Sequence, residues 1–461
     1  MVHELSKDFI LENNIAYNIE KINIFLIKLK YINIGDNNMF FHFVKEGDTL
    51  SSIANNYNID LQKLINDNSL KDPNDLVINQ CLLIAPNDFE YIVKQGDTLS
   101  SISKKYHISI DKLKNENNIT DFLSIGQTLK IKYSTRDKPT KWINAYCYNE
   151  SSLNALKNAL NSLTSLSIFS YQIDLDGHLS SSNDVDIIKL AKEYNVSPIM
   201  VITNSKAKGG FSPSIAKEIL NNSSKQETLL TKIINIMKNK GYEGLNIDFE
   251  YINPEDKNAY ISFLKKAKDV LHQNKFYLTV ALAPKYSSSQ KGLLYEAHDY
   301  NDIGRIADLI VLMTYEWGYT YGPSMPVSPY NEVKKVLDYA KREIPSNKIL
   351  MGLPNYGYIF KLPYKEKQKA ESIKNNKAPE LAYKNKVSYK YNSISRTPYF
   401  RYKINDIEYE VQFDNPYSIS EKITLLDDLN IRGLSIWTIS SCCNYYYLLI
   451  DNYFKVEKNP N

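Results

Sequence analysis

The chain has 461 residues, more than one compact core usually holds, so two or more domains are expected. Hydrophobic residues make up 43% of it and charged residues 23%, an ordinary balance for a globular protein. The net charge of +4 is too small to indicate a nucleic-acid partner. The four cysteines lack metal-ligand spacing, so neither a disulfide framework nor a metal site is predicted.

The first 40 residues contain an apolar segment, INIFLIKLKYINI (22–34), that two lysines interrupt. It is far short of the ~20 apolar residues of a membrane span, so no span is predicted. It follows an acidic, Asn-rich stretch, so no cleavable signal peptide is predicted either. Residues 1–40 are interpreted as a family-specific extension or as a mis-assigned start, with translation beginning at Met39.

An internal repeat comes next along the chain. FVKEGDTLSSIANNYNIDLQKLINDN (43–68) recurs as IVKQGDTLSSISKKYHISIDKLKNEN (92–117), with GDTLSSI identical in both copies. Each copy predicts a strand, a Gly-Asp turn, a helix capped by Thr49 or Thr98, a second helix and a closing strand. The repeat therefore predicts two small modules, at residues 41–86 and 90–133.

The repeated pattern, with its closing GQTLKI in the second copy, resembles the LysM module. That resemblance implies a βααβ fold and binding of glycans that contain N-acetylglucosamine, such as peptidoglycan or chitin. It assigns glycan binding to the turn residues of both copies: Gly47, Asp48, Thr49, Gly96, Asp97 and Thr98. The first copy lacks the Gly of GQTL, so its ligand affinity does not follow from the resemblance. Both modules are expected to tether the chain to an insoluble polymer independently of the remaining domain.

After a polar linker (132–141), short apolar runs alternate with amphipathic helical segments. Eight strands that alternate with helices predict an α/β fold, a parallel (β/α)₈ TIM barrel over residues 141–455. The predicted strands are 142–148, 166–173, 197–203, 244–250, 276–283, 307–315, 348–356 and 433–439. The gap before the eighth strand is too long for one crossover, so residues 358–412 are predicted to form a small inserted α+β lobe.

The predicted fourth strand, EGLNIDFE, has an unusual polar face. Successive strand residues point to opposite sides, so Asn246, Asp248 and Glu250 share one face. Burying these side chains costs several kcal/mol unless they form hydrogen bonds or ion pairs, or take part in the function of the protein. Catalytic groups of such barrels lie at the carboxyl ends of the strands, where further polar and aromatic residues are expected. These are Tyr315, Glu316, Trp317, Asn355, Tyr356 and Trp437.

This segment resembles the fourth strand of glycoside hydrolase family 18, D-G-x-D-x-D-x-E. Asp248 and Glu250 match the pattern, whereas Glu243 and Asn246 replace its first two aspartates. Met313-Thr314-Tyr315 is similar to the family's Met-x-Tyr, and Trp437 to its strand-eight tryptophan. Together with the two LysM-like modules, the chain is similar to the spore cortex-lytic N-acetylglucosaminidases of that family.

The resemblance implies a substrate-assisted hydrolysis of β-1,4 bonds without a metal or other cofactor. It assigns Glu250 as the acid, Asp248 as the group that orients the substrate's acetamido N–H, and Tyr315 as a hydrogen-bond partner of the acetamido oxygen. It assigns substrate binding to Asn246, Glu316, Trp317, Asn355, Tyr356 and Trp437. Asn246 is expected to donate a hydrogen bond to Asp248, and Asp248 is expected to stay anionic over a wide pH range.

The expected partner is spore cortex peptidoglycan, and the chain is expected to be monomeric and located in the spore, with no nucleic acid or membrane span involved. Two alternatives remain open. A LysM-anchored chitinase would carry an aspartate where Asn246 stands. A catalytically weak glycan-binding protein with the same barrel would usually lack the acid at position 250.

Overall fold

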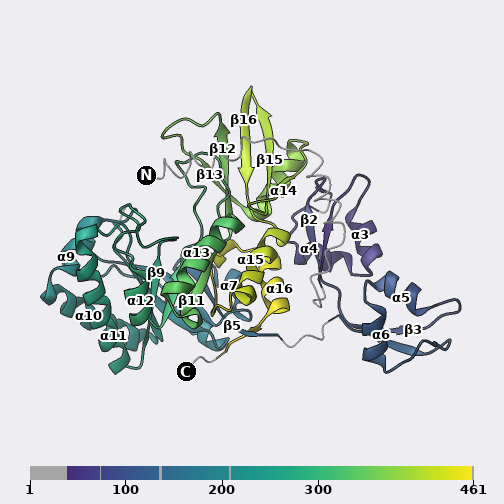
Figure 1. Ribbon diagram of the computed structural model, residues 1–461, viewed down its shortest axis with the longest axis horizontal. Coiled ribbons are helices and arrows are strands. Elements are labelled where there is room, and N and C mark those ends of the chain that lie inside the picture. The colour runs from purple at the N-terminus through teal and green to yellow at the C-terminus, as the bar shows by residue number, and fades with distance from the viewer. Residues whose placement is uncertain (1–38, 73, 134–137, 207–208, 459–461) are drawn as a thin grey trace.

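The chain folds into a barrel, an inserted lobe and two small modules (Figure 1). The computed structural model describes residues 39–72, 74–133, 138–206 and 209–458. The suggested extension and the question of a start at Met39 concern residues 1–40, of which 1–38 lie outside the described residues. Within the described ranges, no helix is long and apolar enough to cross a membrane.

Eight parallel strands close the barrel in chain order, because the last strand pairs with the first. Gly433 of the last strand lies opposite Trp142 of the first. This closed sheet confirms the predicted (β/α)₈ barrel, and a short further strand, β18 (Lys455–Val456), extends it beside β5. The barrel strands are β5 (Thr140–Tyr148), β6 (Ser165–Gln172), β7 (Ser197–Thr203), β8 (Gly244–Asp248), β9 (Tyr277–Leu282), β10 (Leu309–Leu312), β11 (Ile349–Pro354) and β17 (Gly433–Trp437).

Amphipathic helices cover the barrel from outside. The helix α10 shows why they form: Asn222 caps its start by accepting from the Lys225 N–H at 3.1 Å, and Gly241 ends it with φ 84°. Its apolar face, including Leu229 and Ile233, is fully buried. The covering helices are α7 (Leu153–Leu160), α8 (Val185–Glu193), α9 (Pro213–Leu220), α10 (Ser223–Lys240), α11 (Lys257–Gln273), α12 (Tyr300–Ile306), α13 (Tyr330–Glu343), α15 (Pro416–Asp428) and α16 (Asn444–Tyr453).

The inserted lobe lies before the eighth barrel strand, as predicted. It is a five-stranded antiparallel sheet with one α-helix, and it stands above the barrel in Figure 1. Its buried Glu410 accepts from Arg401 Nε at 2.5 Å and from the hydroxyl of Ser324, which lies in the loop after β10. The lobe is thereby tied to a loop at the mouth of the barrel. Its elements are β12 (Tyr356–Leu362), β13 (Glu371–Lys374), α14 (Ala378–Lys384), β14 (Lys390–Asn392), β15 (Thr397–Ile404) and β16 (Ile407–Gln412).

The two small modules have the predicted βααβ order, and each pairs its two strands antiparallel. Thr49 caps the first helix by accepting from the Ser52 N–H at 3.0 Å, and Thr98 does the same for Ser101. The first module contains β1 (Phe40–Phe43), α3 (Leu50–Tyr57), α4 (Leu61–Asp67) and β2 (Cys81–Ile84). The second contains β3 (Phe89–Ile92), α5 (Leu99–Tyr106), α6 (Ile110–Asn117) and β4 (Thr128–Ile131).

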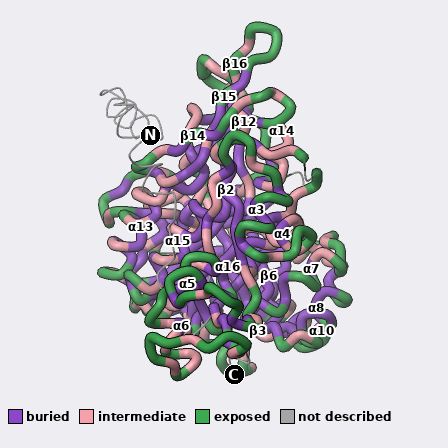
Figure 2. The backbone as a smooth tube through the Cα atoms, turned by 90° about the vertical axis from the view of Figure 1, so that its right-hand side faces the viewer, coloured by how far each residue is buried: buried purple, intermediate pink, exposed green. Residues whose placement is uncertain are grey.

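The first module is packed onto the barrel, a contact that the repeat pattern did not predict. The rings of Phe41 and Phe43 lie 5.6 and 5.8 Å from the ring of Tyr417 in α15. Phe41 belongs to the same buried hydrophobic cluster as the barrel strands and helices. In Figure 2 the tube at β2, the partner strand of β1, has the purple of buried residues. The matching residues of the second module, Glu90 and Ile92, are exposed.

This difference makes a stability prediction. Phe41→Ala should lower the free energy of unfolding by about 3–5 kcal/mol, because it removes a buried ring from the cluster that the module shares with the barrel. Tryptophan fluorescence during urea unfolding measures this for the barrel itself, since all three tryptophans lie in the barrel.

Ile92→Ala is the matched control, because Ile92 is 59% exposed and its loss should change stability by less than about 0.5 kcal/mol. If both variants left the barrel's midpoint unchanged, the first module would not stabilise the barrel.

Candidate active site

The polar face predicted for the fourth barrel strand lines the inside of the barrel. In β8, Leu245 and Ile247 join the hydrophobic cluster under the helices, while Asn246 and Asp248 face the interior and are 0% and 5% exposed. Glu250 follows the carboxyl end of the strand and is partly buried. Two carboxyl groups therefore lie on one wall at the end of the barrel where chemistry usually takes place.

Two residues that sequence reasoning missed hold the backbone around Glu250. Asn204, just after β7, accepts from the Glu250 N–H at 3.0 Å and donates to the Glu250 carbonyl at 2.8 Å. His298 Nδ1 accepts from the Ala283 N–H at 3.0 Å, so its other nitrogen, Nε2, carries the proton and donates to the Phe249 carbonyl at 2.9 Å. Burial lowers the pKa of His298 to about 4, which keeps the imidazole neutral at physiological pH. Asn204 could have been found as a polar residue at a strand's carboxyl end; His298 had no such signal.

Asn246 does not bind Asp248, so that expectation is wrong. Its amide donates to Thr279 Oγ1 at 2.7 Å and accepts from the Tyr146 hydroxyl at 3.1 Å. The reason is register: Thr279 of β9 lies directly opposite Asn246 across the sheet, whereas Asp248 lies two residues along the same strand. The buried Oδ1 of Asp248 has no hydrogen-bond partner among the described residues, and it is available to a substrate group.

The burial of the two carboxyl groups controls their protonation. Burial raises the pKa of Asp248 to about 7. The pKa of Glu250 is raised well above its ordinary value, first by burial and then by the charges of Asp248 and Glu316. Asp248 is therefore not anionic over the wide pH range that the sequence predicted, and the two neighbouring carboxyl groups together retain a proton at a pH where exposed carboxyl groups have lost theirs.

Tyr315 lies close to this pair. Burial raises the pKa of its hydroxyl well above 10, and Tyr146, Asp248 and Glu250 add to the effect, so the hydroxyl remains a donor. Gly352 of the neighbouring strand leaves the space for it, since a Cβ there would come within 2.9 Å of the Tyr315 ring.

Glu316 and Tyr356 meet beside Tyr315. Glu316 has a left-handed backbone, with φ 65°, and accepts from the Tyr356 hydroxyl at 3.0 Å. That bond joins the end of the sixth barrel strand to the base of the inserted lobe. It also fixes a third carboxylate near the general-acid candidate Glu250.

Trp437 ends the eighth barrel strand within a group of aromatic rings. Its ring lies 4.9 Å from Phe169, 5.2 Å from Tyr146 and 5.9 Å from Tyr148, each at a steep interplanar angle. These three partners come from the first two barrel strands and were not predicted as site residues. The edge-to-face contacts fix the orientation of the indole at the barrel mouth.

The last two predicted barrel residues have different surroundings. The Asn355 N–H donates to the Trp437 carbonyl at 2.9 Å and its side chain donates to the Thr438 carbonyl at 3.0 Å, while its buried Oδ1 has no partner in the described chain. Trp317 packs instead against the hydrophobic cluster under the helices. The structure thus does not bring Trp317 into the aromatic group around Trp437.

The six predicted LysM residues all build the turns. Gly47 and Gly96 have φ 85° and 84°, which a residue with a Cβ rarely adopts. Asp48 accepts from the Lys45 N–H at 2.8 Å, and Asp97 makes the same bond to Lys94 at 2.7 Å. Thr49 and Thr98 are the helix caps already described.

None of the site residues belongs to a metal-like cluster. In the described part of the chain, Asp174, Asp176 and His178 bring three ligand atoms within 4.8 Å of one another, and all three are exposed. Asp174 uses an oxygen to accept from the backbone N–H groups of the other two, so the cluster is a surface turn.

Comparison with known proteins agrees with this geometry. The profile of glycosyl hydrolases family 18 matches residues 140–441, and that of the LysM domain matches 42–85 and 91–132. The cortical fragment-lytic enzyme of Bacillus subtilis (strain 168) is 38% identical, over 91% of this chain and 99% of its own. The crystal structure of the spore cortex-lytic enzyme SleL of Bacillus megaterium QM B1551 matches with a TM-score of 0.81 and 37% identity, over 92% of this chain and 100% of its own.

A chitinase of Chromobacterium violaceum ATCC 12472 shares the fold at 21% identity, with a TM-score of 0.63 over 68% of this chain and 99% of its own. The profile match and the near full-length similarity settle the classification: the chain is a glycoside hydrolase that belongs to glycosyl hydrolases family 18 and carries two LysM domains.

Proposed function

We propose that the protein is an N-acetylglucosaminidase that hydrolyses the β-1,4 bond after N-acetylglucosamine in spore cortex peptidoglycan. The observation that carries the proposal is the pair of carboxyl groups at the end of β8, the buried Asp248 and the partly buried Glu250, whose pKa values are both raised. The names of its relatives support the cortex as the substrate and the spore as the location. The LysM match supports binding to peptidoglycan.

The geometry favours a substrate-assisted reaction. Ordinary glycosidases place two carboxyl groups on either side of the scissile bond, about 5–9.5 Å apart. Asp248 ends β8 and Glu250 follows two residues later, so the alternation of an extended chain puts both on one side of a sugar bound at the barrel mouth. The nucleophile must then come from the substrate, and the 2-acetamido group of N-acetylglucosamine supplies it.

Each residue has a defined part in that reaction. Glu250 gives its proton to the leaving glycosidic oxygen while the acetamido oxygen attacks C1, which forms a cyclic oxazolinium ion and breaks the bond. The unpartnered Oδ1 of Asp248 accepts the acetamido N–H and stabilises the positive charge. The Tyr315 hydroxyl donates to the acetamido oxygen, and Trp437 lies under the apolar face of the sugar. Glu250 then removes a proton from the water that opens the ring, with retention at C1.

The remaining substrate-binding assignments stay proposals for the same site: Asn246, Glu316, Trp317, Asn355 and Tyr356. The chain is proposed to act as a monomer. The function is tested by incubating the protein with purified cortex peptidoglycan and with colloidal chitin. Release of fragments with N-acetylglucosamine at the reducing end from cortex is expected; cleavage of chitin alone would establish a LysM-anchored chitinase instead.

The first prediction about the site concerns the acid. Glu250→Gln should lower kcat by about 10²–10⁴-fold, because the amide cannot protonate the leaving oxygen. Turnover of soluble cortex fragments measures the loss, and circular dichroism checks that the fold persists. Activity within tenfold of the unaltered protein would exclude Glu250 as the proton donor.

The second prediction concerns Glu316, whose negative charge helps to raise the pKa of Glu250. Glu316→Gln removes that charge, so the pKa of Glu250 should fall and the alkaline limb of the kcat/KM profile should move to lower pH. Higher salt should reduce the difference between the two proteins, because Glu316 is exposed to solvent.

Glu366→Gln removes the same charge from an exposed turn and serves as the control. An alkaline limb that moves equally in both variants would mean that overall charge, and not Glu316, sets the pKa of Glu250.

The third prediction concerns stability and pH. The pKa of Asp248 is about 7 in the folded chain and about 3.9 in an unfolded one. The folded state therefore binds more protons between these values, and Asp248 lowers stability progressively as pH rises through that window. Asp248→Asn should raise Tm by about 2 °C or more at pH 8 and leave it nearly unchanged at pH 4. An equal effect at both pH values, measured by calorimetry, would show that titration of Asp248 is not the cause.

A further inference from the structure

The two modules present the same edge, made by the turn after the first strand and the loop before the last strand. The Val44 N–H donates to the Gln80 carbonyl at 2.9 Å, and in the second module Val93 makes the same bond to Gln127. These bonds hold each turn beside its loop. We call the pairing of residues 45–49 with 76–80 the first turn edge, and that of residues 94–98 with 123–127 the second turn edge.

The loops of the two edges correspond residue by residue. Gln80 Oε1 accepts from the Val77 N–H at 3.1 Å, and Gln127 Oε1 accepts from the Ser124 N–H at 3.0 Å. Asn79 has φ 66° where the second module has Gly126 at φ 83°, because asparagine tolerates this conformation. Ile78 of the first edge therefore occupies the position of Ile125 in the second.

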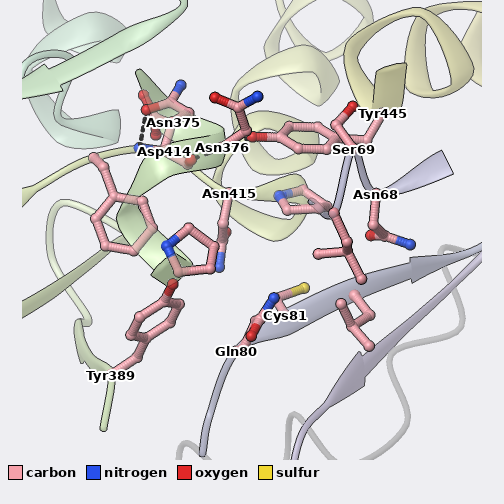
Figure 3. A pocket seen from close by; sticks show the side chains of 15 residues that line it. Asn68, Ser69, Gln80, Cys81, Asn375, Asn376, Tyr389, Asp414, Asn415 and Tyr445 are labelled. Atoms are coloured by element: carbon pink, nitrogen blue, oxygen red, sulfur yellow. Dashed lines mark hydrogen bonds between the residues drawn. The ribbon is translucent and has the colours of Figure 1, made fainter. Parts of the chain in front are cut away.

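The first turn edge is used in packing against the inserted lobe. Val77 is 4% exposed and lies in the lobe's own hydrophobic cluster. Asn79 donates to the Tyr389 carbonyl at 3.1 Å, and the Tyr389 N–H donates to the Ile78 carbonyl at 3.1 Å. Figure 3 shows Gln80 and Cys81 of the first module facing Tyr389 and Asn415 across a cavity of only about 30 Å³.

A second set of contacts fixes the same module to the barrel. Asn444, at the start of α16, donates its N–H to Ser69 Oγ at 2.8 Å and its amide to the Asn66 carbonyl at 2.7 Å. The loop between α4 and β2 is thus held by the barrel at one end and by the lobe at the other. A glycan strand could occupy this loop only by displacing those contacts.

The second turn edge is free in the described structure. Phe122, directly before it, is 86% exposed and Ile125 is 72% exposed. The hydrogen bonds of residues 118–127 in the described chain stay within the module. In Figure 1 the second module, with α5 and α6, lies at the outer edge of the molecule. It contacts the first module through the ring of His107, 4.9 Å from that of Tyr57.

The formal charges of the two modules also differ, and the difference favours the second module as the one that binds the glycan. Residues 42–85 carry three lysines and six acidic residues, a formal charge of −3. Residues 91–132 carry seven lysines and four acidic residues, a formal charge of +3. Peptidoglycan bears carboxylates on its peptide stems, so the second module attracts it and the first repels it. A neutral chitin chain would gain nothing from this difference.

We propose that the two modules have separate roles. The first is a structural bracket between barrel and lobe, and the second alone recruits the anionic, N-acetylglucosamine-containing glycan through its free turn edge and Phe122. This division of roles rests on the proposed function in one respect only, the class of glycan that the second module binds.

Cosedimentation of the full chain with insoluble cortex peptidoglycan tests the division. All proteins carry Glu250→Gln so that the polymer is not digested. Ile125→Ser should weaken binding about tenfold, because it removes an apolar side chain that the glycan would cover. The matched Ile78→Ser should change binding less than about twofold, and raising the salt concentration should weaken binding in the Glu250→Gln parent.

Equal losses in both serine variants, a larger loss for Ile78→Ser, or no loss in either would overturn the division of roles. Binding to colloidal chitin as tight as to cortex, or insensitive to salt, would overturn the assignment to an anionic glycan. The unaltered enzyme is assayed in parallel on soluble cortex fragments. If the unaltered enzyme fails to hydrolyse those fragments, the proposed function falls, while the sedimentation result still decides which module binds.

Discussion

The site depends on the burial of two carboxyl groups that one strand presents on the same face. Asp248 and Glu250 cannot both be charged cheaply in this position, so they retain a proton at a pH where exposed carboxyl groups have lost theirs. That shared proton is what acid catalysis needs. The barrel supplies the burial, and the unpartnered oxygen of Asp248 leaves one polar contact for the substrate to complete.

A buried acid is useful only if it cannot turn away from its substrate. The backbone on both sides of Glu250 is held from two directions, by Asn204 from the preceding strand and by His298 from the following loop. Both contacts use neutral groups, so they position the acid without adding charge that would change its pKa. Asn246, which lies deeper in the barrel, is also a neutral group. Its amide is hydrogen-bonded to Thr279 and Tyr146, so it adds no third charge beside the two carboxyl groups. The charge that does reach Glu250 comes from Asp248 and Glu316.

The barrel, the inserted lobe and the βααβ modules could be predicted because each has a local pattern in the sequence. The polar face of β8 could be predicted for the same reason, since alternation in one strand is visible without neighbours. What could not be predicted depends on residues brought together from distant segments. The partner of Asn246 is set by its register with β9, and His298 reaches Phe249 across 49 positions of the chain. The pKa of Asp248 likewise depends on how deeply its carboxyl group is buried, and a strand pattern does not give that depth.

The different packing of the two modules also depends on contacts between distant segments, yet part of the difference was visible in the repeat. Where the first module has Phe41 and Phe43, the second has Glu90 and Ile92, and an exposed charge replaces a buried ring. A duplicated module that keeps its turn but gains an apolar face on its first strand acquires a packing surface in addition to the turn edge. A module packed through that face cannot move freely relative to the barrel. Rigid attachment of one copy also limits where the other can lie relative to the barrel. A polymer held at the second turn edge is then presented to the active site from a restricted set of positions, so its effective concentration at Glu250 is set by how well those positions match the barrel mouth.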